Sequence, residues 1–134
     1  MRENELEQRQ MEMAKILAVL HQQEEKLREI IESQKRNTED MEGLYNTESL
    51  DIQLLESHRA YGIKLTIDER NQERVIENTK AILEKKQIEV REAHKKVEVL
   101  KKLKEKQEQE YYKEFLDAEV KEIDDLTSAR FNIK

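Results

Sequence analysis

The chain almost lacks the two residues that most strongly interrupt helices. It has 134 residues, no proline and two glycines, Gly43 and Gly62. Proline removes a backbone donor and clashes inside a helix, and glycine costs about 1 kcal/mol relative to alanine. Because nearly every other residue tolerates helix, the sequence predicts an all-α protein.

The composition limits how wide the hydrophobic core can be. Charged side chains make up 42% of the residues, hydrophobic side chains 36% and aromatic ones 4%. Such a chain can bury a narrow seam but cannot fill a broad globular core. Disorder of the isolated chain is an alternative, although disordered chains are usually enriched in proline, glycine and serine. We therefore expect a coiled coil.

Apolar residues in the first third of the chain follow a seven-residue repeat. The repeat consists of Leu6, Met13, Leu20, Leu27 and Met41, with Ile16, Ile30 and Leu44 three residues after that register. This spacing places one apolar stripe along a helix, which we expect at about residues 2–44. Four polar residues share the stripe, where they restrict partner and register at a cost in stability: Arg9, Gln23, Gln34 and Asn37.

The repeat stops where turn-forming residues gather. We expect a turn at residues 45–48, a short helix at 49–61 that ends at Gly62, and a long helix at 63–129. The long helix carries a second seven-residue repeat, with Ile76, Leu83, Val90, Val97, Tyr111 and Ala118 in register and Ala93 and Leu100 at the companion position. The sequence thus predicts one domain over residues 1–134, a two-helix antiparallel coiled-coil hairpin with a short middle helix near the bend.

The last part of the chain is predicted to lack a partner helix. Folded back from the turn, residues 1–44 reach only about position 107 of the long helix, which leaves 108–134 uncovered. This tail is rich in apolar residues and is a candidate docking element: Tyr111, Tyr112, Phe115, Leu116, Val120, Ile123, Leu126 and Phe131. The alternative is that the tail dimerises or frays.

Residues typical of catalysis and metal binding are sparse. The chain has three histidines and no cysteine. A carboxylate-bridged metal bundle needs Glu-x-x-His, but the positions three before the histidines hold Ala18, Leu55 and Arg91. There is also no glycine-rich phosphate loop. We predict no enzymatic activity, no cofactor and no metal site.

Charge and hydropathy restrict the partners. The formal net charge is −6 and the aromatic residues do not alternate with arginine, so no nucleic acid is expected. The longest apolar run, Ile16–Leu20, is too short for direct membrane insertion. Basic residues predominate at 84–106 and acidic residues at 107–125, a dipolar pattern that can orient a partner or merely solvate the helix. The absence of cysteine agrees with a cytoplasmic location.

Residues 100–131 resemble the carboxy-terminal signature of the flagellar export protein FliJ family. That signature combines a Leu-x-x-Leu-Lys-Glu-Lys segment with a later acidic segment and a closing Arg/Lys-Phe. The matching residues are Leu100, Leu103, Lys104, Glu105 and Lys106, then Lys121, Glu122, Asp124 and Asp125, then Arg130 and Phe131. The predicted order of helices is similar to the family's over nearly the whole chain. Family members usually begin with further residues containing Phe and Leu, so we expect the terminal tip to be incomplete and frayed.

The resemblance implies a non-enzymatic, cytoplasmic component of the flagellar type III protein export apparatus, associated through partners with the inner membrane. Its implied partners are the hexameric flagellar export ATPase, the cytoplasmic domain of the export-gate membrane protein, and export chaperones. By resemblance, the ATPase-binding tip includes Lys101, Lys104, Glu105, Tyr111, Phe115, Lys121, Asp124 and Asp125. The gate-binding surface maps to Ile30, Ser33, Asn37, Tyr61, Leu65 and Gln72, although Ile30 and Leu65 also fit the seam.

Two other functions are compatible with the sequence. One is a homo-oligomeric structural coiled-coil spacer, whose long helices pair between chains. The other is a general export chaperone that covers exposed apolar helices of several clients. A monomeric hairpin favours the export function, and a parallel dimer of extended chains favours the spacer.

Overall fold

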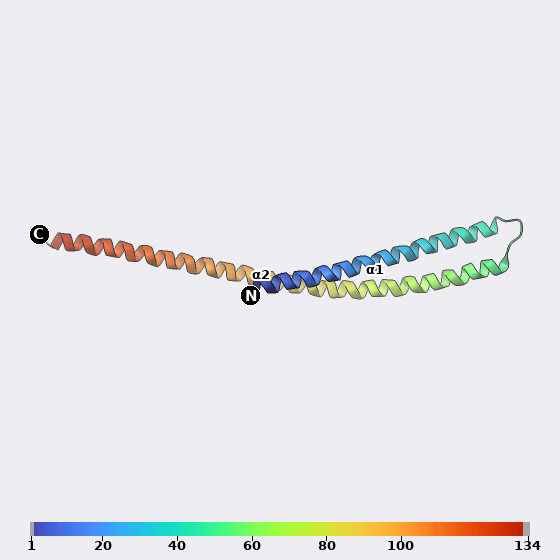
Figure 1. The fold of residues 1–134 in the computed structure, drawn as a ribbon, viewed down its shortest axis with the longest axis horizontal. Coiled ribbons are helices and arrows are strands. Elements are labelled where there is room, and N and C mark those ends of the chain that lie inside the picture. Colours follow the sequence, from blue (N-terminus) through green and yellow to red (C-terminus); the bar gives the residue numbers. More distant parts are fainter. Residues whose placement is uncertain (1, 133–134) are drawn as a thin grey trace. The chain divides into compact units, whose positions relative to one another are not determined.

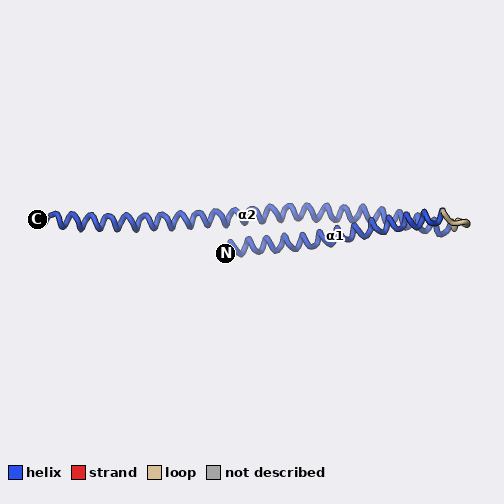
Figure 2. The backbone as a smooth tube through the Cα atoms, turned by 90° about the horizontal axis from the view of Figure 1, so that it is seen from above, coloured by secondary structure: helices blue, strands red, loops and turns tan. Residues whose placement is uncertain are grey.

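The protein is built from two long helices. The computed structural model describes residues 2–132, and in that range it contains α1, Arg2–Tyr45, and α2, Ile52–Asn132, with no strand. A loop at residues 46–51 joins them (Figures 1 and 2). The all-α prediction is confirmed.

The chain divides into two compact units. One unit is Glu7–Arg91, in which α1 and the first half of α2 pack against each other (Figure 1). The other combines the amino-terminal residues up to Leu6 with α2 from Glu92 onward. Each helix therefore contributes to both units.

The seam follows the predicted seven-residue repeats. Every residue of the α1 stripe from Leu6 to Leu44, including its four polar members, is buried or half-buried. On α2 the same is true of each repeat position from Leu55 to Val97. Among residues 4–131 no side chain is completely buried: the most buried apolar residues, Ala93 and Leu65, keep 4% and 5% exposure. This is the narrow core that the composition predicts.

Contacts between the helices of the Glu7–Arg91 unit have a regular order. Arg9 contacts Glu89 near one end, Gln34 contacts Glu69, and Asn37 contacts His58 near the loop. Residue numbers thus rise along α1 while those of its partners fall along α2.

The predicted short middle helix is wrong, because α2 runs without interruption from Ile52 through Gly62. Its first turn is capped by Asp51, whose Oδ1 accepts a hydrogen bond from the Leu54 backbone N–H at 3.1 Å. Gly62 has no positive φ, so its conformation is that of an ordinary helical residue. The turn predicted at 45–48 lies at 46–51, and the long helix predicted at 63–129 is Ile52–Asn132.

The uncovered tail begins earlier than predicted. Val97 is the last buried residue of α2, and every described side chain from 98 to 131 is exposed. Because α2 starts to pair directly after the loop, residues 52–61 use part of α1 that the prediction assigned to later residues. Each α1 residue consequently lies opposite an α2 residue that is about three helical turns closer to the loop than predicted. The final two residues of the predicted tail lie outside the described residues.

An ion cluster links the helices at the end of the Glu7–Arg91 unit far from the loop. Lys86 Nζ lies 3.2 Å from Glu12 Oε2 and 3.5 Å from Glu89 Oε2, and Arg9 Nη1 contacts both carboxylates. The hydrogen bond from Lys86 lowers the pKa of Glu12 below its ordinary 4.5. The same bond raises the pKa of Lys86 above 10.5. Both shifts favour the charged pair in the folded state.

Candidate partner-binding surfaces

A polar layer near the loop joins α1 to α2 through one buried amide. Asn37, 6% exposed, donates from Nδ2 to the backbone oxygen of His58 at 2.9 Å. Its Oδ1 lies 2.8 Å from His58 Nδ1, which donates when that ring nitrogen carries the proton. A Cβ added at Gly62 would lie 3.1 Å from Asn37 Nδ2. Gly62 therefore provides the space in which Asn37 reaches across the seam.

A shallow hollow opens beside this layer. It has a volume of about 290 Å³ and is lined by Ser33, Arg36, Asn37, Asp40, His58 and Tyr61. The lining combines an exposed aromatic ring with a guanidinium, a carboxylate and an imidazole. Three of the predicted gate residues, Ser33, Asn37 and Tyr61, meet here.

The remaining predicted gate residues lie in the seam. Leu65 and Gln72 are buried, at 5% and 7% exposure, and Ile30 is half-buried. Gln72 Nε2 donates to the Gln23 backbone oxygen at 2.9 Å, so its amide is used between the helices. Of the six gate residues, Tyr61 offers the largest accessible side chain, with 45% exposure.

All eight predicted ATPase-tip residues are exposed on α2. With about 100° between successive helical residues, they spread around most of the helix. One side carries Lys101, Lys104, Glu105, Tyr111 and Phe115. Asp125 lies next to Tyr111 at the edge of that side, and Lys121 and Asp124 lie on the other side. The predicted set is therefore a band around the helix and not one face.

The tail has an apolar side of its own. Tyr112, Phe115, Leu116, Ile123 and Leu126 lie on one side at spacings of three, four and seven residues, and their exposure ranges from 40% to 62%. A hollow of about 190 Å³ between Ile123, Leu126, Thr127 and Arg130 lies on this side. The stripe does not continue the seam register, which in the tail passes through Lys104, Gln107, Tyr111, Glu114 and Ala118.

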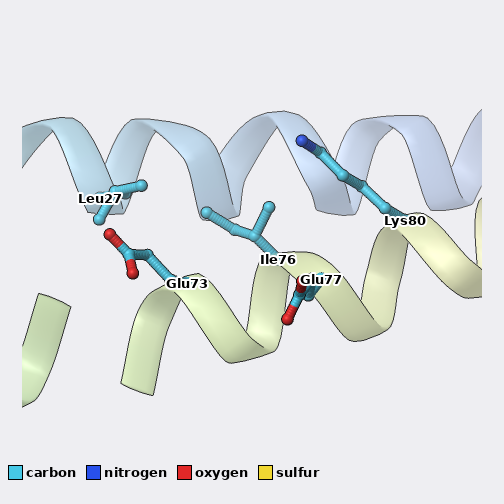
Figure 3. Close-up of a pocket in the computed structure, with 5 residues that line it drawn as sticks. All are labelled: Leu27, Glu73, Ile76, Glu77 and Lys80. Atoms are coloured by element: carbon cyan, nitrogen blue, oxygen red, sulfur yellow. The ribbon is translucent and has the colours of Figure 1, made fainter. Parts of the chain in front are cut away.

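A third hollow lies between the helices on the side opposite Tyr61. Figure 3 shows Leu27 of α1 and Ile76 of α2 between the two ribbons, surrounded by Glu73, Glu77 and Lys80. Three of the five lining residues are charged. This side of the Glu7–Arg91 unit is therefore mainly a polar surface around a narrow apolar contact.

The described part of the chain has neither a metal-binding cluster nor a membrane-spanning stretch. Residues 2–132 contain no group of three or more His, Asp or Glu side chains arranged to hold a metal ion. Neither described helix has a stretch long and apolar enough to cross a membrane.

Comparison with known proteins gives no relative. No family model matches the sequence, and the searches of curated proteins and of solved structures returned no significant match.

The sequence prediction missed the Asn37–His58–Gly62 layer because it interpreted Gly62 as a helix end. A signal was present: Leu55, Gly62, Ile76 and Leu83 are separated by multiples of seven. An unbroken repeat through a glycine indicates a helix that continues, with the glycine facing its partner.

Proposed function

We propose that the two helices form an antiparallel coiled-coil hairpin and that the chain is a non-enzymatic component of the flagellar type III protein export apparatus. In this function it binds the hexameric export ATPase like a central stalk, contacts the export-gate protein and escorts export chaperones. The resemblance over residues 100–131 supports the identity of these partners, and it favours a cytoplasmic location beside the inner membrane.

The exposed end of α2 is the observation that carries the proposal. Beyond Val97 no described side chain is buried, yet the segment keeps an amphipathic helical pattern with Phe115 at 53% exposure. A helix with an uncovered apolar side is suited to insertion into a complementary opening. A stalk needs no catalytic group. It can shift the equilibrium between the conformational states of the ATPase subunits only if it binds those states with different affinities.

The hollow beside Tyr61 supports a second contact, to the gate. Ser33, Asn37 and Tyr61 from the predicted gate set surround one accessible depression. Leu65 and Gln72 support that surface from the seam. ATPase and gate contacts would then use different parts of the chain, so one molecule can serve both.

The first test is to mix the purified chain with the hexameric export ATPase and measure ATP hydrolysis and co-elution. We expect stimulated hydrolysis and one chain per hexamer. Phe115→Glu should abolish stimulation, whereas Ile67→Glu, at nearly the same exposure of 54%, should not. Reversing the charges of Lys101, Lys104 and Asp125 should weaken stimulation without loss of helicity.

The same experiment separates the alternatives. Absence of both binding and stimulation with a folded chain would refute the ATPase role. Sedimentation as a parallel dimer would instead support the homo-oligomeric spacer. Binding to several unrelated export substrates would support the general chaperone.

A further inference from the structure

One layer of contacts between α1 and α2 joins an asparagine to a glycine. Asn37 is 6% exposed, and its Nδ2 donates to the backbone oxygen of His58 at 2.9 Å. A Cβ at Gly62 would lie 3.1 Å from the same Nδ2. The amide of Asn37 therefore occupies a space that exists only because position 62 has no side chain. We call this space the notch.

The notch occurs once in the repeat of α2. Residues at multiples of seven from Gly62 share its side of the helix, and all of them are buried or half-buried. They are Leu55, Glu69, Ile76, Leu83, Val90 and Val97. Since each of these residues has a large side chain, the amide of Asn37 fits opposite position 62 and not opposite another position of the series.

The apolar repeats alone do not select how the helices pair. Both helices repeat every seven residues, so sliding α1 along α2 by seven residues, about 10 Å, brings one apolar stripe against the other again. Smaller steps would turn apolar residues out of the seam. The register, meaning which α2 residue lies opposite each α1 residue, must therefore be selected by contacts that do not repeat.

Asn37 loses its place when the helices slide in either direction. If α1 moves seven residues toward the carboxyl end of α2, Glu69 takes the position of Gly62 opposite the amide. If α1 moves the other way, Leu55 takes that position. A Cβ there lies 3.1 Å from Nδ2 before the rest of the side chain is added. Both neighbouring registers thus displace the amide, and a buried amide without its hydrogen bonds is costly.

The ion cluster at the other end of the Glu7–Arg91 unit fits the same register. Glu12 contacts Lys86 at 3.2 Å, and Arg9 contacts Glu89 at 3.3 Å. The residues seven positions from Lys86 and Glu89 in either direction are Thr79, Ile82, Ala93 and Lys96. None of them is a carboxylate, so Arg9 would lose its partner on α2 in both neighbouring registers.

We propose that Asn37, His58 and Gly62 form a register lock, which holds α1 and α2 at one of the positions that their apolar repeats allow. A buried polar residue at one seam position can fix the register of a coiled coil, and here the glycine makes that position unique. The lock prevents the helices from sliding past each other, so an axial force on one helix is passed to the other. This role is independent of the identity of any partner.

Moving the notch by seven residues tests the lock. The exchange of two residues, Gly62→Glu with Glu69→Gly, keeps the composition and places the notch one repeat closer to the carboxyl end of α2. Asn37 then has room opposite position 69 and can donate to the backbone oxygen of Leu65, four residues before the new glycine. We expect α1 to move seven residues, about 10 Å, along α2.

Distances between spin labels report the register. The chain has no cysteine, so labels can be attached at two exposed positions, Gln22→Cys on α1 and Ser57→Cys on α2. Double electron–electron resonance, with the labelled chain diluted in unlabelled chain, should give about 30 Å in the parent and about 10 Å more in the exchanged chain. A pair within α2, Ser57→Cys with Lys80→Cys, should keep its distance in every variant, because sliding does not change it.

Matched variants assign the effect to the layer. Adding Asn37→Ala to the exchange should restore the parent distance, because alanine does not need the notch and the remaining contacts favour the parent register. Glu12→Gln with Lys86→Gln removes an ion pair and leaves the notch, so it should also give the parent distance. Circular dichroism checks that each variant is helical. If the exchanged chain loses helix, Asn37→Leu with Gly62→Leu makes the layer uniformly apolar and should show the parent distance together with one about 10 Å longer or shorter.

Three results would overturn the inference. The first is the parent distance alone in the exchanged chain or, if that chain is not helical, in Asn37→Leu with Gly62→Leu. The second is a shift that persists when Asn37→Ala is added to the exchange, since the amide would then not select the register. The third is the same shift in the chain with Glu12→Gln and Lys86→Gln, which would assign the register to the ion pair.

Discussion

Replacing Gly62 by alanine should destabilise the protein, although a helix interior normally gains from this change. Helix propensity alone favours alanine by about 1 kcal/mol. The new Cβ would lie 3.1 Å from Asn37 Nδ2, which donates to His58 O at 2.9 Å. Displacing the amide breaks the two hydrogen bonds to His58, each worth about 0.5–1.5 kcal/mol. The losses sum to about 2 kcal/mol, so we expect a net destabilisation of about 1 kcal/mol.

Urea unfolding, monitored by circular dichroism, measures this balance. The alanine substitutions are made at Gly62 and at Gly43, in the parent chain and in an Asn37→Ala chain. Gly43→Ala is the matched control, because a Cβ there meets nothing within 4 Å, and it should leave stability unchanged or raise it. In an Asn37→Ala background, Gly62→Ala should become stabilising by about 1 kcal/mol, which gives a coupling of about 2 kcal/mol between the two sites. If Gly62→Ala stabilises the parent chain as much as the Asn37→Ala chain, the close approach has no energetic role and the reasoning fails.

Three further predictions concern the pair of helices. The Glu12–Lys86 pair contributes its full stabilisation between pH 4.5, the ordinary pKa of Glu12, and pH 10.5, the ordinary pKa of Lys86. The contribution is lost as pH falls through the lowered pKa of Glu12 or rises through the raised pKa of Lys86. The stabilities of the parent chain and Glu12→Gln, measured by thermal unfolding, should therefore converge in acid, and a constant difference down to pH 2 would contradict the pairing. Gln23 has a buried Oε1 without a hydrogen-bond partner among the described residues, so Gln23→Leu should stabilise the helix pair by about 1 kcal/mol in urea unfolding, and a loss of stability would contradict this. Deleting residues 108–134 should lower the helical signal but leave the thermal midpoint of the helix pair unchanged, because no described side chain beyond Val97 is buried; a large drop in the midpoint would show that the tail supports the fold.

The position of the candidate surfaces could be predicted only in part. Five of the eight predicted ATPase-tip residues lie in the tail that was expected to be uncovered, 108–134. The other three, Lys101, Lys104 and Glu105, are exposed because the uncovered segment begins earlier, at residue 98. The predicted gate-binding residues are less accessible than their placement on one helix face implies, because Leu65 and Gln72 lie in the seam. The spacing that puts residues on one side of a helix does not state which side another helix covers.

The helices and their seam follow from the amino-acid sequence alone. Without proline, and with Leu6 to Leu44 and Ile76 to Val97 in seven-residue repeats, the chain had few alternatives to paired helices, because periodicity is a local property that the residues carry with them. Tertiary structure decided the role of Gly62 and the length of the tail. Whether a glycine ends a helix or makes room for a neighbour depends on what lies opposite, and Asn37 is 25 residues away in the sequence. The continuous α2 then pairs directly from the loop, and this pairing leaves every described side chain beyond Val97 exposed.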